Sequence, residues 1–330
     1  MAELETRPSF RDQLQRQWDQ GKFLCGGLDP DYSKIPEFLK IKHHRERFRV
    51  LSEFTNSIVE ATADIVGFYK PNLAFYEGFW DGEEFENRAN GEEVLQVLVD
   101  KIHELHPAIP IIGDGKRADI GATNKYYDKM FDRYGFDAMT TNPYFGGDTF
   151  PSLQATHPDK GLIVLCRTTN PGSKELQDMP IRPTDAAHDK LLTEEDMWEL
   201  LDIKNDGHIQ KGLALLETKV TVYEMVAYLA SKRWNENGQM GLVVGATDPE
   251  AFAPVRKLAP NMPFLIPGIG TQGGNLEASL KFAPDSNNQG IIINNGSAII
   301  HASSGEDFAE AARREALAYD KKIREGLGIV

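Results

Sequence analysis

This sequence of 330 residues is poor in cysteine, and it has neither a long apolar run nor an apolar segment among residues 1–18. Its two cysteines, Cys25 and Cys166, cannot form a disulfide framework, and each lies in an apolar stretch. We interpret both as buried core thiols in a reducing compartment. No run approaches the ~20 apolar residues that a membrane-spanning helix needs. Residues 1–18 mix charged and amide side chains, so we expect no secretory signal and a cytoplasmic protein.

Positively charged residues are fewer than negatively charged ones. Lys and Arg total 36 against 50 Asp and Glu, which gives a formal net charge of −14. Nucleic acids and anionic membranes are bound by basic faces that displace counterions, so this balance argues against both as partners. A small anionic ligand is still compatible with it, because such a ligand needs only a few local donors. The scattered histidines show no metal-ligand spacing, and we expect no metal site.

Short apolar runs alternate with stretches of helical periodicity along the chain. We expect strands at Phe23–Leu28, Ile65–Tyr69, Ile109–Gly113, Ala138–Thr141, Leu162–Cys166, Leu242–Gly245, Phe264–Ile266 and Gly290–Ile293. We expect helices at Glu46–Ala63, Glu92–Leu105, Thr123–Tyr134, Val222–Trp234 and Asp248–Leu258, the last opened by a cap and a proline. Eight strands separated by helices predict an α/β fold, a closed (β/α)8 TIM barrel that residues 1–330 form as a single domain.

One segment does not follow this alternation. Residues 178–216 are polar and acidic, and they lie between the fifth and sixth expected strands. This connection is much longer than an ordinary loop. Thr193–Asp196 predicts the start of a helix that runs through Leu201. We interpret 178–216 as an acidic helical insertion in the barrel and not as a second domain.

Polar and charged residues collect where the expected strands end, which is where such a barrel places its catalytic groups. They are Asp29, Lys70–Asn72, Asp114–Thr123, Asn142–Tyr144, Arg167–Gly172, Pro267–Gly274 and Asn294–Ser297. Within this set, Arg167 either supports the loop that follows it or pairs with an acid.

The third of these segments carries the sharpest signal. Asp114 and Lys116 are two residues apart on a strand and should project to the same face, with Asp119 following where the chain turns. A lysine held among carboxylates stays protonated, which suits a proton donor better than a Schiff-base nucleophile. A lone D-x-K-x-x-D pattern is more often a surface ion-pair cluster. The position after a strand, with Lys70 after the preceding strand, favours an active site.

Residues Asp114–Thr123 resemble the D-x-K-x-x-D-I-x-x-T signature of the orotidine 5′-phosphate decarboxylase family. Segments similar to the longer bacterial-type branch of that family follow the same order: Leu28–Pro30, Phe68–Asn72, Thr141–Tyr144, Cys166–Gly172, Val244–Thr247 and Leu265–Gly274. Only residues 178–216 and the two termini lack an obvious counterpart. The resemblance implies a β/α-barrel homodimer with shared active sites. It also implies conversion of orotidine 5′-monophosphate to uridine 5′-monophosphate, the last step of de novo pyrimidine synthesis, without metal or organic cofactor.

The resemblance also implies roles for individual residues. Lys116 would protonate C6 of the pyrimidine as carbon dioxide leaves, and Asp114 would lie beside the departing carboxylate. Lys70, together with Asp119 from the second subunit, would complete an alternating array of charges. The implied substrate-binding residues are Asp29, Lys70 and Thr123 at the ribose, Asn72 at the ribose or the lysine array, Ile120 and Thr169 at the pyrimidine, and Pro267 and Gln272 in the phosphate loop. For Asn72, a role in stabilising the turn is an open alternative.

The phosphate end departs from the family pattern. An arginine usually follows the eighth strand there, whereas this chain has Ser297 and no further arginine before Arg313. The Ser297 hydroxyl and the backbone N–H groups of Gly296 and Ala298 could bind an anion, but they offer no bidentate, charge-assisted partner. We expect either weaker phosphate binding or a contact from another residue.

Three other interpretations are compatible with parts of this sequence. Residues 268–273 fit G-x-G-x-x-G, but the preceding proline and the absence of an acidic residue at the next strand end argue against a dinucleotide site. A magnesium-dependent sugar-phosphate decarboxylase or aldolase of the same barrel group is a second alternative. A non-catalytic nucleotide-binding relative is the third. The joint presence of Lys70, Asp114, Lys116 and Asp119 favours the decarboxylase over a protein that only binds.

Overall fold

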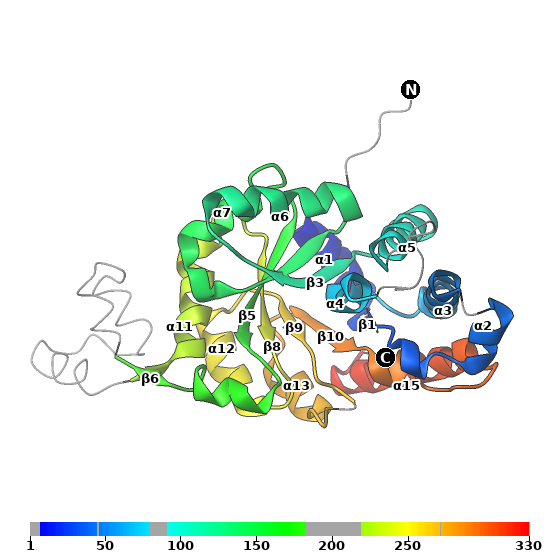
Figure 1. Cartoon of the computed structure of the whole chain (residues 1–330). Coiled ribbons are helices and arrows are strands. Elements are labelled where there is room, and N and C mark those ends of the chain that lie inside the picture. Colours follow the sequence, from blue (N-terminus) through cyan, green and yellow to red (C-terminus); the bar gives the residue numbers. More distant parts are fainter. Residues whose placement is uncertain (1–6, 45, 80–90, 183–218, 271, 330) are drawn as a thin grey trace, which may run out of the picture.

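A ring of eight parallel strands forms the centre of the computed structural model, which describes residues 7–44, 46–79, 91–182, 219–270 and 272–329. The strands are β1 (Leu24–Leu28), β2 (Phe68–Pro71), β3 (Ile112–Arg117), β4 (Ala138–Thr141), β5 (Gly161–Arg167), β8 (Met240–Val244), β9 (Phe264–Ile266) and β10 (Ile291–Asn295). Their order is β2-β1-β10-β9-β8-β5-β4-β3, and isolated bridges join β2 to β3. Each barrel strand thus pairs with the barrel strand that follows it along the chain, and the last pairs with the first. This arrangement confirms the predicted (β/α)8 barrel (Figure 1).

Helices surround this ring (Figure 1). They are α1 (Phe10–Asp19), α2 (Glu37–Lys42), α3 (Arg47–Thr62), α4 (Leu73–Glu77), α5 (Gly91–Leu105), α6 (Gly121–Tyr134), α7 (Phe150–Leu153), α11 (Val222–Leu229), α12 (Phe252–Leu258), α13 (Leu276–Phe282), α14 (Ser297–Ile300) and α15 (Phe308–Gly326). In α5 the buried side chains are Val94, Leu95, Leu98, Val99 and Ile102. This spacing places one apolar stripe against the barrel and leaves the opposite face to solvent. In the described part of the chain, no helix is long and apolar enough to cross a membrane.

Strands β1, β8 and β10 are buried along their whole length, as expected for a parallel sheet covered by helices. Helix α1 closes the amino-terminal end of the barrel. Its Trp18 donates a hydrogen bond to the carbonyl of Ile291 at the start of β10, and its Phe10 packs against Gly161 at the start of β5. The opposite end, where the strands finish, is left open for a cavity.

Strand boundaries differ from the expected ones at both ends of the barrel. The second strand is Phe68–Pro71 instead of Ile65–Tyr69, and the third begins at Ile112 instead of Ile109. At the open end, the third strand continues to Arg117 instead of ending at Gly113, and the last continues to Asn295 instead of Ile293. Polar side chains led the sequence interpretation to end both strands early. In the barrel these residues still pair with neighbouring strands, because the interior at the carboxyl end holds a polar cavity into which such side chains fit.

Two expected helices are each made of two parts. Val222–Trp234 begins as α11 and ends in a π-helical turn, Ala230–Trp234. Asp248–Leu258 begins with the 3-10 turn Pro249–Ala251 and continues as α12. Asp248 does stand at the N-terminal cap position, but its side chain makes no capping hydrogen bond. It pairs with Arg167 instead, at 2.7 Å.

The chain leaves the barrel after β5 through a two-stranded antiparallel ribbon of β6 (Pro180–Ile181) and β7 (Val220–Thr221). The predicted insertion over 178–216 lies mostly between these strands. Its helix from Thr193 lies outside the described residues. The ribbon brings the two ends of this segment together, so that the barrel resumes at α11 beside the point where the segment departs.

Candidate active site

A cavity of about 500 Å³ opens at the carboxyl ends of the barrel strands. Its lining residues come from six of the expected strand ends and from the interior of the barrel. They are Asp29, Lys70, Asn72, Asp114, Lys116, Thr140, Leu165, Thr168, Thr169, Asn170, Gln177, Val243, Leu265, Pro267, Gly268, Ile269, Gln272, Asn294, Asn295, Gly296 and Ser297. The location agrees with the sequence-based expectation that strand ends carry the chemistry.

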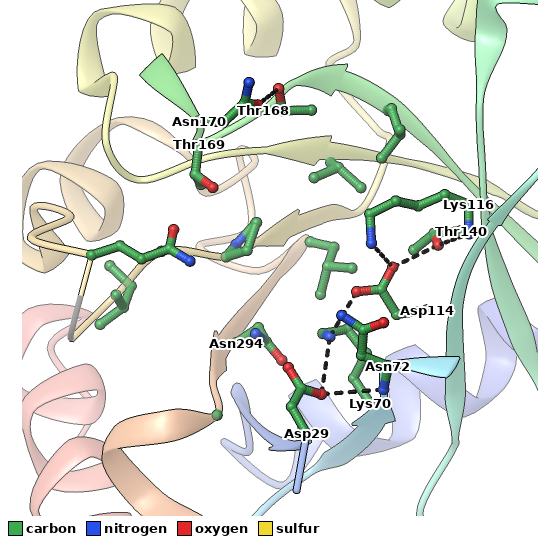
Figure 2. Close-up of a pocket in the computed structure, with 18 of the residues that line it drawn as sticks. Asp29, Lys70, Asn72, Asp114, Lys116, Thr140, Thr168, Thr169, Asn170 and Asn294 are labelled. Carbon is green, nitrogen blue, oxygen red and sulfur yellow. Dashed lines mark hydrogen bonds and ion pairs between the residues drawn. The ribbon is translucent and has the colours of Figure 1, made fainter. Parts of the chain in front are cut away.

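Charged side chains of alternating sign line one side of this cavity (Figure 2). Lys116 Nζ lies 2.7 Å from Asp114 Oδ1, and Lys70 Nζ lies 2.9 Å from Asp114 Oδ2. On its other side, Lys70 Nζ is 3.9 Å from Asp29 Oδ1. Three consecutive strand ends, those of β1, β2 and β3, therefore place Asp29, Lys70, Asp114 and Lys116 in one row.

Burial and neighbouring charges act against each other in this row. Burial opposes ionisation of Asp114, but Lys70 and Lys116 outweigh it and hold the pKa of Asp114 well below its usual range. Burial alone would lower the pKa of Lys70, yet Asp114 and Asp29 raise it overall. Burial is the largest influence on Asp29 and raises its pKa, with Lys70 acting in the opposite direction. Asp114 and Lys70 are thus a carboxylate and an ammonium group at neutral pH.

The most solvent-accessible member is Lys116, whose side chain is 49% exposed, compared with 4% for Lys70. Its backbone lies in the left-handed region, with φ 50°, which costs a residue other than glycine about 1–2 kcal/mol. The pairing of β3 with β4 shifts register between Gly113 and Arg117. Asp114 and Lys116 do share a face as predicted. A bulge in β3 brings them together, however, and not the regular alternation of a strand.

The loop after β5 forms the opposite side of the cavity, with Thr168, Thr169 and Asn170 (Figure 2). Gln177 Oε1 accepts a hydrogen bond from the backbone N–H of Thr168, and its Nε2 donates to Thr168 Oγ1. Thr168 Oγ1 in turn donates to Asn170 Oδ1 at 2.8 Å. This chain of hydrogen bonds fixes the conformation of the loop.

Arg167 supports the same loop through ion pairs and hydrogen bonds. Its guanidinium is buried and pairs with Asp178 at 3.1 Å and with Asp248 at 2.7 Å. It also donates to the hydroxyl of Ser173 and to Gln177 Oε1. The structure shows both of the roles that the sequence left open for Arg167. Its guanidinium pairs with acids, and its hydrogen bond to Gln177 supports the loop.

The third side of the cavity comes from the loops after β9 and β10, with Pro267, Gly268, Gln272, Gly296 and Ser297. Gly268 has φ 94°, a conformation that other residues rarely adopt, and a side chain there would collide with Thr169. Among the described lining residues, the only cationic side chains are Lys70 and Lys116, on the other side of the cavity. The expected anion-binding end therefore offers hydroxyl, amide and backbone donors.

Three expected site residues lie outside the cavity of their own chain. Asp119 precedes α6, and its carboxylate accepts a hydrogen bond from the backbone N–H of Ile120. The Ile120 side chain is 64% exposed, and Thr123 is also exposed in the first turn of α6. The structure thus groups the remaining expected residues around one cavity and leaves these three on the neighbouring surface.

Several residues that line the cavity are not among the site residues expected from the sequence. Thr140 lies inside the apolar β4, and Gln177 lies at the edge of the acidic segment, so neither stands at an expected strand end. A threonine within a strand buried on both faces is a usable signal, because its hydroxyl needs a partner there. Asn294 and Asn295 were recognised as following a strand, but they were not assigned to the site.

Metal-ligating side chains do not cluster in the parts of the chain that the structure describes: no group of three or more His, Cys, Asp or Glu is placed to hold an ion. Both carboxylates in the cavity, Asp29 and Asp114, face Lys70. The charge that a cation would neutralise is thus matched by ammonium groups.

Curated relatives resemble the chain over nearly its whole length. Orotidine 5′-phosphate decarboxylase of Dechloromonas aromatica (strain RCB) is 39% identical over 311 residues, covering 94% of this chain and 96% of that protein. The enzyme of the same name from Ralstonia pickettii (strain 12J) is 38% identical over 318 residues, covering 96% of this chain and 98% of that protein.

A solved structure is also similar to this chain over nearly its whole length. The structure of Leishmania donovani OMP decarboxylase is 30% identical, with a TM-score of 0.69, over 96% of this chain and 99% of that one. A family model described as "Orotidine 5'-phosphate decarboxylase / HUMPS family" matches residues 22–314, a span that includes every strand of the barrel and every residue lining the cavity. The chain therefore belongs to the orotidine 5′-phosphate decarboxylase / HUMPS family.

Proposed function

We propose that this protein decarboxylates orotidine 5′-monophosphate to uridine 5′-monophosphate, without metal or organic cofactor, in de novo pyrimidine synthesis. The observation that carries the proposal is the row of Asp29, Lys70, Asp114 and Lys116 on one side of an open cavity. Relatives named for this activity align with nearly the whole chain. The buried thiols Cys25 and Cys166 support the proposed cytoplasmic location.

In the proposed reaction, the bond between C6 and the substrate carboxylate breaks and carbon dioxide leaves. The electron pair stays on C6, where Lys116 Nζ donates a proton to form the new C–H bond, and the resulting amine is reprotonated from solvent. Asp114 holds this Nζ at 2.7 Å, so the ammonium is in place before charge develops. A fixed positive group contributes most when it faces charge that appears only in the transition state.

The remaining lining residues fit the other parts of the nucleotide. We assign Asp29, Lys70 and Asn72 to the ribose, since Asp29 also accepts a hydrogen bond from the Asn72 backbone at 3.1 Å. Thr169 faces the cavity from the β5 loop and would contact the pyrimidine. Pro267, Gln272, Gly296 and Ser297 would surround the phosphate. With neutral donors there, we propose weaker phosphate binding than an arginine would give.

A homodimer accounts for the three residues outside the cavity. Asp119, Ile120 and Thr123 lie at the start of α6, where the apolar side chains of Ile120 and Tyr126 are 64% and 71% exposed. We propose that a second copy covers this surface and contributes these residues to its neighbour's site. Exposed apolar side chains of this kind mark surfaces that a partner covers.

We propose as well that residues 1–330 make a single barrel domain that carries 178–216 as an insertion. Supporting this, one cluster of buried apolar side chains extends from Phe10 to Leu327 and includes residues of every barrel strand.

The decisive experiment follows the loss of orotidine 5′-monophosphate absorbance with purified protein, with and without EDTA, alongside Lys116→Ala. We expect turnover that survives chelation and falls by at least about 10³-fold in the variant, since a charged donor to the developing charge is lost. Turnover abolished by EDTA would point instead to the magnesium-dependent alternative. Binding of uridine 5′-monophosphate without turnover at millimolar substrate would point to the non-catalytic one.

A further inference from the structure

Thr140 is the residue of β4 that faces the bulge in β3. Met139 pairs with Gly113 and Thr141 pairs with Arg117, so Thr140 alone stands opposite Asp114, Gly115 and Lys116. The side chain is 1% exposed to solvent and lines the cavity. A buried hydroxyl at an interruption of strand pairing can replace the hydrogen bonds that the interruption removes.

The Thr140 hydroxyl makes two hydrogen bonds within the charged row (Figure 2). Its Oγ1 accepts the backbone N–H of Lys116 at 2.9 Å and donates its proton to Asp114 Oδ1 at 2.8 Å. The same Oδ1 accepts Lys116 Nζ at 2.7 Å. One hydroxyl is therefore bonded both to the backbone of the lysine and to the carboxylate that holds the lysine's side chain.

We propose that Thr140 is a positioning residue for the decarboxylation, which keeps Lys116 in its left-handed backbone conformation and aims its Nζ at the substrate. This inference rests on the proposed function. The left-handed backbone at Lys116 is disfavoured for a lysine, so it needs contacts that maintain it. Among the hydrogen bonds described, the one to Thr140 fixes the Lys116 N–H. Without it, the lysine can relax and its ammonium group can move away from C6.

Thr140→Val tests the proposal, because valine keeps the branched shape and removes both hydrogen bonds. We expect kcat to fall by about 10- to 100-fold, the effect of a small displacement of a reacting group. KM and the affinity for uridine 5′-monophosphate, measured by calorimetry, should stay within about threefold of wild type, because the other contacts to the nucleotide are intact. Thr140→Ser, which keeps the hydroxyl, should retain kcat within about threefold.

A matched control separates positioning from general destabilisation. Thr55→Val also removes a buried hydroxyl, one that donates to the Leu51 carbonyl in α3, away from the cavity. We expect it to lower stability without lowering kcat. If Thr140→Val does not fold, Thr140→Ser against Thr140→Ala provides the same comparison, because these two differ by the hydroxyl alone.

Three results would overturn the proposal: Thr140→Val with wild-type kcat, Thr140→Ser as impaired as Thr140→Val, or a rise in KM and a loss of nucleotide affinity that accompany the fall in kcat. A crystal structure of Thr140→Val provides a readout independent of turnover. There we expect Lys116 to leave its left-handed conformation or its Nζ to leave Asp114, and an unchanged Lys116 would contradict the inference. An inactive wild-type protein would refute the proposed function, while this structural readout still decides the role of Thr140.

Discussion

Under the proposed function, Ser297 would contact the phosphate of the substrate. It is the first residue of α14, directly after Gly296, and the described lining residues at this end of the cavity include no lysine or arginine. A hydroxyl and an amide each contribute a single, neutral hydrogen bond, whereas a guanidinium contributes two charge-assisted ones. If the phosphate binds beside Ser297, as proposed, this single residue limits the affinity for it.

Replacing Ser297 with arginine should strengthen substrate binding. Hydrogen bonds to charged groups contribute about 1.5–3 kcal/mol, so we expect Ser297→Arg to lower KM by about 10- to 100-fold. The value of kcat should stay within about threefold, because the charged row of Lys116 and Asp114 is untouched. Steady-state kinetics on orotidine 5′-monophosphate measure both constants.

Ser297→Gln is the control for this change, since glutamine adds length without charge. Its KM should remain near that of the wild type. An unchanged or higher KM in Ser297→Arg would show that the phosphate does not lie beside Ser297 and would redirect attention to other donors of the cavity.

At the scale of elements, β3 and β4 are tied together at both of their ends by side chains. At the carboxyl end, Thr140 bonds to the bulge that carries Lys116. At the amino end, Asp137 precedes β4 and accepts the backbone N–H of Ile111, just before β3, at 3.0 Å. The link at the carboxyl end is the one we propose to serve catalysis, and we expect the link at the amino end to contribute to stability.

Asp137 is fully buried among positive and polar groups. Arg7 donates to both carboxylate oxygens at 3.0 Å, while Lys160 Nζ lies 3.3 Å from Oδ1 and His103 Nε2 lies 3.5 Å from Oδ2. Burial opposes ionisation of Asp137, but these partners outweigh it and hold its pKa well below the usual range. The ionised carboxylate therefore stabilises the folded chain.

We predict that Asp137→Asn lowers the free energy of unfolding by about 3–5 kcal/mol at pH 7, because it leaves buried cations without their anion. Because the pKa of Asp137 is lower when folded than when unfolded, its stabilisation is present above the unfolded value of about 4 and is lost as pH falls below it. Denaturant titrations at pH 7 and pH 3 should show the difference between wild type and variant shrinking in acid.

Glu60→Gln serves as the comparison, because Glu60 pairs with Lys101 at the surface and is 59% exposed. Exposed pairs contribute less than about 1 kcal/mol, so this variant should unfold much like the wild type. An Asp137→Asn protein as stable as the wild type at pH 7 would contradict the role assigned to the buried cluster.

At the scale of the whole molecule, the site is incomplete within one chain if Asp119 takes part in it. Asp119 lies outside the cavity that holds Lys116, yet both belong to one motif three residues apart. A symmetric dimer resolves this, since each subunit would present Asp119, Ile120 and Thr123 to the other's cavity.

Mixing two inactive variants tests the shared site directly. In a hybrid dimer of Lys116→Ala and Asp119→Ala, one site carries both substitutions and the other carries none. After subunit exchange in an equimolar mixture, about a quarter of wild-type activity should return, since half of the dimers are hybrids with one intact site each. Activity that stays at the level of the separate variants would contradict the shared site.

A second mixture serves as control for subunit exchange. Lys116→Ala and Asp114→Ala both remove residues that one chain supplies to its own cavity. Each site in their hybrid dimer therefore carries one of the two substitutions, and no activity should return. Sedimentation of both mixtures tests whether dimers are present.

The alternation of strands and helices, and with it the barrel, could be predicted from the sequence. The residues of the charged row could be predicted as well, because Lys70, Asp114 and Lys116 directly follow apolar runs and match a family signature. These features are local: periodicity and short motifs are written in neighbouring residues. The ends of β3 and β10 were misplaced, because polar residues read as loops when the cavity into which they point is not visible in the sequence.

The contacts that hold these residues in place depend on the three-dimensional fold. Hydrogen bonds in the site join residues that are far apart in the sequence. The separation is 24 positions for Thr140 and Lys116, 44 for Lys70 and Asp114, and 81 for Arg167 and Asp248. The bulge in β3 and the left-handed backbone of Lys116 likewise have no local signal, because lysine itself disfavours that conformation. Strand pairing and buried hydrogen bonds join residues far apart in the chain, so their partners are fixed by closure of the barrel and not by any one segment.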